Sequence, residues 1–128
     1  MKKYSVGIDL GGTKILTALV DRTTGEVLGT VKKKTKKDKG PKNIVRKMIE
    51  SIEELFEETL VNKDEISSIG IGAAGQIDRK NGIIIGAPNL DCYDLDIKDR
   101  IASHFDLPVF FVIPDPITEG CSVESAFG

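Results

Sequence analysis

The residues of this 128-residue chain that could do chemistry stand together near its amino terminus, in the stretch GIDLGGTK. Gly11 and Gly12 have no Cβ, so backbone N–H groups there can approach an anion closely. Thr13 adds a hydroxyl donor and Lys14 adds a cation. Asp9 would oppose a bare phosphate, but the conflict disappears if a hydrated Mg²⁺ lies between the carboxylate and the phosphate. These residue types favour a turn that binds phosphate together with magnesium.

The same stretch has a plainer interpretation. Gly11 and Gly12 can form only a hairpin turn, with Asp9 and Thr13 capping it through local hydrogen bonds. Two better-known phosphate motifs are excluded, because a P-loop needs GxxxxGK followed by Ser or Thr and a dinucleotide fingerprint needs GxGxxG opening a helix. On this stretch alone, the phosphate turn and the simple hairpin both stay open.

Hydrophobic periodicity places the turn between two strands. YSVGIDL and KILTALVD alternate apolar and polar residues, which is typical of the paired strands of a hairpin. A third strand, EVLGTVKKKT, follows the turn-like RTTG, in which Gly25 supplies the positive φ that a tight turn demands. The chain therefore opens as an antiparallel three-stranded meander.

A long amphipathic helix is predicted next, over IVRKMIESIEELFEETL, after a break at Gly40 and Pro41. The glutamates form a solvated face, comprising Glu50, Glu53, Glu54, Glu57 and Glu58. The apolar residues share the buried face, comprising Val45, Met48, Ile49, Ile52, Leu55, Phe56 and Leu60.

The second half of the chain predicts more strands and a second helix. ISSIGIGAAG and GIIIGAP are the strands, and QIDRKNG between them is expected to be a hairpin turn. DIKDRIASHFD predicts a helix capped by Asp96, with Ile97, Ile101 and Phe105 at helical spacing, and LPVFFV follows as a buried strand. This order indicates an α/β fold with a mixed sheet.

Composition excludes several partners. A net charge of -2 and a pI of about 5.4 give no reason to expect nucleic acid or an anionic membrane. Seven lysines between Lys32 and Lys42 have no aromatic residues among them, which favours a solvated strand end over a nucleic-acid patch. No apolar run approaches the roughly 20 residues that span a bilayer, and the first residues read as a cytoplasmic start. Cys92 and Cys121 have no spacing typical of a disulfide framework or a zinc site.

Three segments, in order, resemble the ROK family (repressors, open reading frames and sugar kinases). GIDLGGTKILTALVD resembles its phosphate-1 segment, and IGIGAAGQID resembles its GIGxPGxVD. GAPNLDCYDLDIKDRIASHFDLPVFF resembles its sugar loop, helix and strand, so the resemblance covers residues 4–112. It implies a ribonuclease H-like lobe, as in actin and hexokinase: an α/β fold whose mixed sheet opens with the meander and has helices packed on it.

The resemblance also implies an activity. The protein looks like the amino-terminal lobe of an ATP-dependent hexose kinase of glucokinase type, which transfers a phosphoryl group from ATP-Mg to a sugar hydroxyl. Residues 9–14 would hold the ATP phosphates and Mg²⁺, with Asp9 positioning the water shell of the metal. Gly75 and Gln76 would approach the sugar, and Asn89 would hydrogen-bond its hydroxyls. Without the resemblance, Asn89 after Pro88 is simply a turn residue.

The chain departs from the family pattern after Val112. Asp115 falls in register with the family's general base, but Pro114 replaces an asparagine and Pro116 follows directly. The plainer alternative for Asp115 is an exposed turn aspartate. We therefore divide the chain into a ROK-type lobe, residues 1–112, and a divergent tail, residues 113–128. The sharp change motivates the hypothesis that the gene or reading frame is disrupted there.

Further expectations follow from the missing second lobe. Half a cleft should be nearly inactive, and its uncovered apolar surface should favour self-association or a homo-oligomer. The repressor branch is disfavoured because only six residues precede Gly7, too few for a DNA-reading helix-turn-helix. Two alternatives stay open: a non-catalytic sugar- or nucleotide-binding module, and a phosphatase of the same broad fold, against which the GAPNL segment argues.

Overall fold

The computed structural model describes residues 2–35, 40–73, 76–78, 81, 83–87 and 92–111. Two helices are present in this part of the chain, α1 (Pro41–Thr59) and α2 (Ile97–Phe105), together with a short 3-10 turn, η2 (Lys63–Glu65). The strands are β1 (Tyr4–Leu10), β2 (Lys14–Asp21), β3 (Val27–Lys34), β4 (Ile66–Ala73), β5 (Gln76–Asp78), β6 (Ile83–Ala87), β7 (Cys92–Asp96) and β8 (Val109–Phe111).

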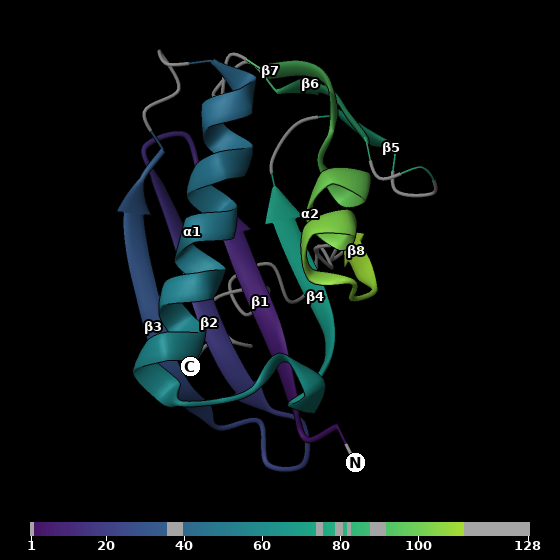
Figure 1. Cartoon of the computed structure of the whole chain (residues 1–128). Coiled ribbons are helices and arrows are strands. Elements are labelled where there is room, and N and C mark those ends of the chain that lie inside the picture. Colours follow the sequence, from purple (N-terminus) through teal and green to yellow (C-terminus); the bar gives the residue numbers. More distant parts are fainter. Residues whose placement is uncertain are drawn as a thin grey trace, which may run out of the picture.

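The strands form two sheets. The larger sheet has the order β3-β2-β1-β4-β8, in which β1, β2 and β3 are antiparallel neighbours and β4 runs parallel to both β1 and β8. The smaller sheet, β5-β6-β7, is antiparallel. Both helices lie on one face of the larger sheet, and the smaller sheet lies beyond the end at which β1 and β4 finish (Figure 1). The predicted α/β fold, with its mixed sheet and opening meander, is confirmed.

Alternation along β1 decides which residues reach the core. Val6, Ile8 and Leu10 are buried against the helices, as the period of two requires. Asp9 lies between two of these buried residues, so its side chain is on the opposite face of the sheet, away from α1 and α2. The first strand therefore carries the predicted metal-binding carboxylate on the face that the helices leave uncovered.

Helix α1 provides most of the cover for the sheet. It starts at Gly40, whose φ of 92° suits glycine, with Pro41 in the first turn, where the missing N–H costs nothing. Its apolar face is confirmed with one correction. Leu60 does not extend that face: it follows the last helical residue in a left-handed conformation (φ 59°) and is 90% exposed. The helix ends before the turn that would have carried Leu60 toward the sheet.

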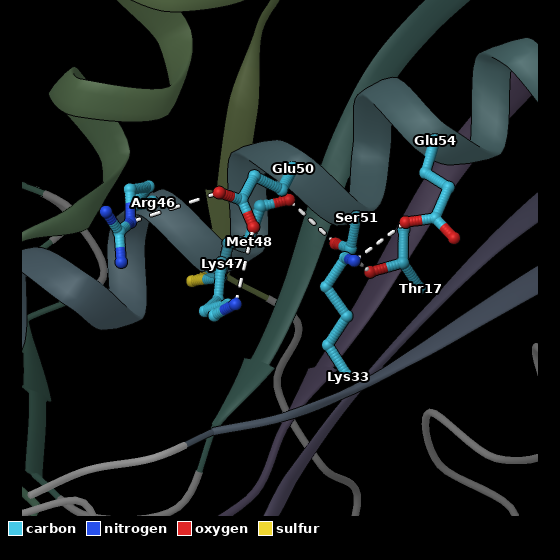
Figure 2. Close-up of polar contacts among 8 residues, drawn as sticks. All are labelled: Thr17, Lys33, Arg46, Lys47, Met48, Glu50, Ser51 and Glu54. Carbon is cyan, nitrogen blue, oxygen red and sulfur yellow. Dashed lines mark hydrogen bonds and ion pairs between the residues drawn. The ribbon is translucent and has the colours of Figure 1, made fainter. Parts of the chain in front are cut away.

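Two buried hydroxyls join β2 to α1. Ser51 Oγ donates to the backbone carbonyl of Met48 at 2.7 Å, and Thr17 Oγ1 lies 2.7 Å from Ser51 Oγ (Figure 2). Because a serine hydroxyl has one proton, and Met48 accepts it, Thr17 is the donor to Ser51. Both side chains are fully buried with their donors satisfied, so the pair is tolerated in an otherwise apolar interface.

Part of the glutamate face of α1 is used for ion pairs. Lys33 Nζ of β3 lies 2.7 Å from Glu54 Oε2, and Glu50 forms ion pairs with Arg46 at 3.9 Å and with Lys47 at 3.5 Å (Figure 2). The hydrogen bond that Lys33 donates to Glu54 raises the pKa of Lys33 above its ordinary value of 10.5. The prediction of a solvated face is confirmed for Glu57 and Glu58, which are exposed. Glu50 and Glu54 are paired with basic side chains, and Glu53 lies 3.6 Å from His104 Nε2.

Helix α2 agrees with its prediction. Asp96 accepts the Asp99 N–H at 3.4 Å as the N-cap, and Ile97, Ile101 and Phe105 are buried.

The region around QIDRKNG was predicted wrongly. Gln76–Asp78 is the strand β5 rather than part of a turn, and its partner is β6. Strand β4 does not pair with β6 at all, because β4 belongs to the larger sheet. Strand β7, over Cys92–Asp96, was not predicted. A three-residue strand is too short to show alternation, and β7 was hidden because its last residue also caps α2.

Candidate functional site

The predicted phosphate-binding residues form a tight connection between β1 and β2, which we call the glycine turn (residues 11–14). The Gly11 N–H donates to the Lys14 carbonyl at 3.0 Å and closes the turn. A Cβ on residue 11 would lie 3.0 Å from that same carbonyl oxygen. The neighbour is backbone and cannot swing aside, so close approach, rather than an unusual φ, is what requires glycine at position 11.

A residue that sequence reasoning missed holds the glycine turn from outside. Thr35, directly after β3, is fully buried. Its hydroxyl donates to the Gly11 carbonyl at 2.7 Å, and its backbone N–H donates to the Thr13 carbonyl at 2.9 Å. The available signal was slight: Thr35 is the uncharged residue within KKKTKK, and it has the inward parity of Val31 and Lys33.

The turn also carries backbone N–H donors. Within the part of the chain that the structure describes, the N–H groups of Gly12 and Thr13 have no hydrogen-bond acceptor. Gly12 is half-buried, and both Thr13 and Lys14 are exposed. Adjacent amides in such a turn form a concavity suited to an anion, with the Thr13 hydroxyl and the Lys14 ammonium at its edge.

Asp9 lies beside this turn. In the sheet it is opposite Leu16 of β2 and Gly72 of β4, and it is half-buried. Because Gly72 has no side chain, the β4 side of the Asp9 carboxylate is not filled by that neighbour. The structure thus brings together Asp9, the glycine turn and Lys14, as the sequence predicts.

A magnesium ion fits this arrangement in one way. Among residues 2–35, 40–73 and the other described segments, no group of three His, Cys, Asp or Glu side chains could hold a metal by itself. Mg²⁺, however, keeps several waters and is commonly bound by one or two carboxylates plus substrate phosphates. Asp9, next to a turn whose Gly12 and Thr13 amides lack an acceptor within the described segments, could supply the protein's share of such a site.

The predicted sugar contacts are placed only in part. Gln76 is the first residue of β5 and its Cα is opposite that of Gly86. It follows closely on β4, whose carboxyl end lies at the same edge of the sheet as that of β1. Gly75, Asn89 and Asp115 lie outside the described residues. No helix in the described part of the chain is long and apolar enough to cross a membrane.

The meander, the parallel strands beside it and the helices on one face define a ribonuclease H-like lobe of the actin and hexokinase type. The ROK family profile matches residues 5–113, and the chain belongs to the ROK family.

Individual relatives agree. A glucokinase from Thermotoga maritima is 33% identical over 106 residues, which are 82% of this chain and 32% of that protein. The crystal structure of a ROK family glucokinase from Streptomyces griseus, in complex with glucose and AMPPNP, is 31% identical with a TM-score of 0.73, over 85% of this chain and 32% of that one. A putative xylose repressor from a Caldicellulosiruptor species is 29% identical over 96% of this chain and 30% of its own length.

The coverage and the variety of these relatives define what family membership says about this chain. The chain spans just under a third of the length of the curated relatives it matches, and the match to the glucokinases is to their amino-terminal part. The family includes transcriptional repressors as well as sugar kinases. The chain therefore corresponds to the amino-terminal part of glucokinase-like ROK proteins.

Proposed function

We propose that this chain is the amino-terminal lobe of an ATP-dependent sugar kinase, and that the glycine turn binds the phosphates of ATP. The observation that carries the proposal is the turn itself, in which the amides of Gly12 and Thr13, beside the Asp9 carboxylate, have no acceptor among the residues that the structure describes. The Streptomyces griseus relative, whose structure holds glucose and AMPPNP, supports ATP and a hexose as ligands.

The side chains have distinct roles in this proposal. The turn amides and the Thr13 hydroxyl donate to phosphate oxygens, and Lys14 offsets their charge. Asp9 accepts hydrogen bonds from the waters of Mg²⁺, and the bound ion neutralises charge on the phosphates. Asp115 is proposed as the base that takes the proton of the attacked sugar hydroxyl.

The sugar side of the site is proposed from the family pattern. Gly75 and Gln76 approach the hexose, and Asn89 both donates to and accepts from its hydroxyls. The division into a lobe, residues 1–112, and a divergent tail, residues 113–128, belongs to the same proposal, as do self-association and a cytoplasmic location.

We propose catalytic turnover only for a protein that also contains the region which, in the relatives, follows the matched amino-terminal segment. Phosphoryl transfer depends on positioning and electrostatics between closing lobes, so the amino-terminal lobe alone supplies binding. A second candidate is a non-catalytic sugar- or nucleotide-binding module, because the N–H donors of the glycine turn suffice for binding without turnover.

Titration of the labelled chain by heteronuclear NMR, with ATP and magnesium, tests the proposal. The amide signals of Gly11, Gly12 and Thr13 are expected to shift, and AMP, which lacks the β- and γ-phosphates, is the matched control. An ATP titration that leaves these signals unchanged would overturn the proposal.

Product assays then separate the functions. Sugar-dependent ADP formation supports the kinase, and binding without turnover supports the module. Phosphate release without a sugar acceptor would indicate the phosphatase.

A further inference from the structure

The glycine turn is held by hydrogen bonds at three of its carbonyls. Gly11 and Thr13 accept from Thr35 at 2.7 and 2.9 Å, and Lys14 accepts from Gly11 at 3.0 Å. The two bonds from Thr35 come from one buried residue that lies beyond β3, more than twenty positions away in the sequence. The conformation of the turn therefore depends on the third strand of the meander, and not only on the hairpin.

These bonds set the direction in which a free amide points. A trans peptide is planar, so the C=O of one residue and the N–H of the next point in opposite directions. The described chain has no cis peptide bond. Since the Thr35 hydroxyl draws the Gly11 carbonyl toward itself, the Gly12 N–H on the same peptide points away from Thr35. That N–H has no acceptor among the described residues.

We propose that Thr35 is a positioning residue of the site: through the Gly11 carbonyl, it holds the Gly12 N–H turned outward to receive a phosphate oxygen. This inference takes its ligand from the proposed function, whereas the orientation of the Gly12 N–H is independent of that function. Without the hydroxyl, the Gly11–Gly12 peptide can rotate and present its carbonyl oxygen where an anion would sit. A carbonyl in that place repels the phosphate that the N–H would bind.

The choice of residue fits this role. A hydroxyl can donate to the Gly11 carbonyl, whereas valine has the same shape and no donor. Thr30, exposed on β3, offers a matched control, because its substitution removes a hydroxyl from that strand without touching the turn.

The test compares Thr35→Val and Thr35→Ser with Thr30→Val in the full chain. Thr35→Val is expected to weaken ATP-magnesium binding roughly tenfold, the size of one hydrogen bond to a bound group. Thr35→Ser keeps the donor and should restore affinity to within about threefold of the parent. Thr30→Val should bind as the parent does. The NMR signal of the Gly12 amide should move in free Thr35→Val and stay in place in Thr35→Ser.

Three outcomes decide the matter. If Thr35→Val binds like the parent and leaves the Gly12 signal in place, the positioning role is wrong. If the parent itself does not bind ATP, the proposed function fails, while the Gly12 signal in the free variants still decides whether Thr35 orients the turn. If Thr35→Val does not fold, Thr35→Cys, whose thiol is a weaker donor, should bind between the serine variant and no binding. Parent-like binding by the cysteine variant would overturn the proposal.

Discussion

The two turns of the meander are built in opposite ways. The first, the glycine turn, depends on distant Thr35 and leaves two amides with no acceptor among the described residues. The second, which we call the Asp21 turn (residues 21–26), pairs all of its backbone N–H groups, and only that of Arg22, which donates to the Lys3 carbonyl at 2.9 Å, uses an acceptor outside the turn. Asp21 Oδ1 accepts the N–H groups of Thr23 at 2.8 Å and Thr24 at 3.1 Å. Gly25, with a φ of 77°, donates to the Asp21 carbonyl at 2.8 Å.

The difference separates a turn that only reverses the chain from one that can hold a ligand. In the Asp21 turn, Asp21 accepts three of the backbone N–H groups, and the others donate to Lys3, Thr24 and Glu26. In the glycine turn, the carbonyls of Gly11, Thr13 and Lys14 are engaged, and the N–H groups of Gly12 and Thr13 have no acceptor in the described part of the chain. Surplus donors held in place by remote contacts are what an anion site requires.

The largest effect should come from adding a Cβ to the glycine turn. Gly11→Ala puts a methyl group 3.0 Å from the Lys14 carbonyl, so the turn must shift and ATP-magnesium affinity should fall by roughly tenfold or more. The matched control is Gly25→Ala, which meets no atom within 4 Å but has a φ of 77°. It should lower the free energy of unfolding by about 1–2 kcal/mol and leave affinity unchanged. Calorimetric titration measures the affinity of both variants, and urea denaturation measures their free energy of unfolding. If Gly11→Ala bound ATP-magnesium like the parent, the proposed difference between the two turns would be wrong.

Removing the charge of Asp9 should affect only the contribution of magnesium. Asp9→Asn keeps the size of the side chain, so the gain in ATP affinity on adding magnesium should shrink by roughly tenfold. Affinity measured with a chelator present should change little. Asp64→Asn, on the exposed turn η2, is the control. An unchanged magnesium dependence in Asp9→Asn would show that the ion is held elsewhere.

Breaking the Asp21 turn should cost stability without changing binding. Asp21→Ala removes the acceptor of two backbone N–H groups, which are exposed and can turn to water. We expect a loss of about 1 kcal/mol in the free energy of unfolding, read from the urea midpoint. Loss of ATP binding in this variant would mean that the two turns are coupled.

The smallest effect belongs to the ion pair between β3 and α1. Glu54→Gln should lower the free energy of unfolding by about 0.2–1 kcal/mol at neutral pH, because both partners are partly solvated. The pKa of Lys33 is raised in the folded chain, so this contribution is full below the unfolded pKa and disappears as the pH rises through the folded value. Melting temperatures of parent and variant should therefore converge well above pH 10.5, the ordinary lysine value. Glu57→Gln, on the same helix and exposed, is the control.

Much of the larger sheet could be predicted from the sequence, because its signals are local. Alternation revealed β1 and β2, and the cap at Asp96 located the start of α2. Helix α1 was predicted from Ile44, after the break at Gly40 and Pro41, but it begins three residues earlier, at Pro41. The end of α1 could not be predicted in the same way. Leu60 continues the apolar spacing, yet it adopts the left-handed conformation that glycine more often takes at a helix end.

The candidate site also contains residues that local sequence signals predicted and a residue that they did not. The glycine turn and Asp9 were predicted because their residue types are unusual in a row, whereas Thr35 looked like one more polar residue in a lysine-rich loop. Its importance comes from tertiary hydrogen bonds to Gly11 and Thr13, which no local pattern encodes.

The parallel pairing of β1 with β4 has a consequence for the order of folding. Tyr4 pairs with Ile66, so this contact closes a long loop. The meander and the hydrogen bonds of Thr35 to the glycine turn involve only the first 35 residues. Contacts of short sequence separation form before those that must close long loops, and the amino-terminal part of a chain is also the first to leave the ribosome. We therefore expect the glycine turn to take shape early in synthesis, while the place of Gly72 beside Asp9 is settled late, when β4 arrives.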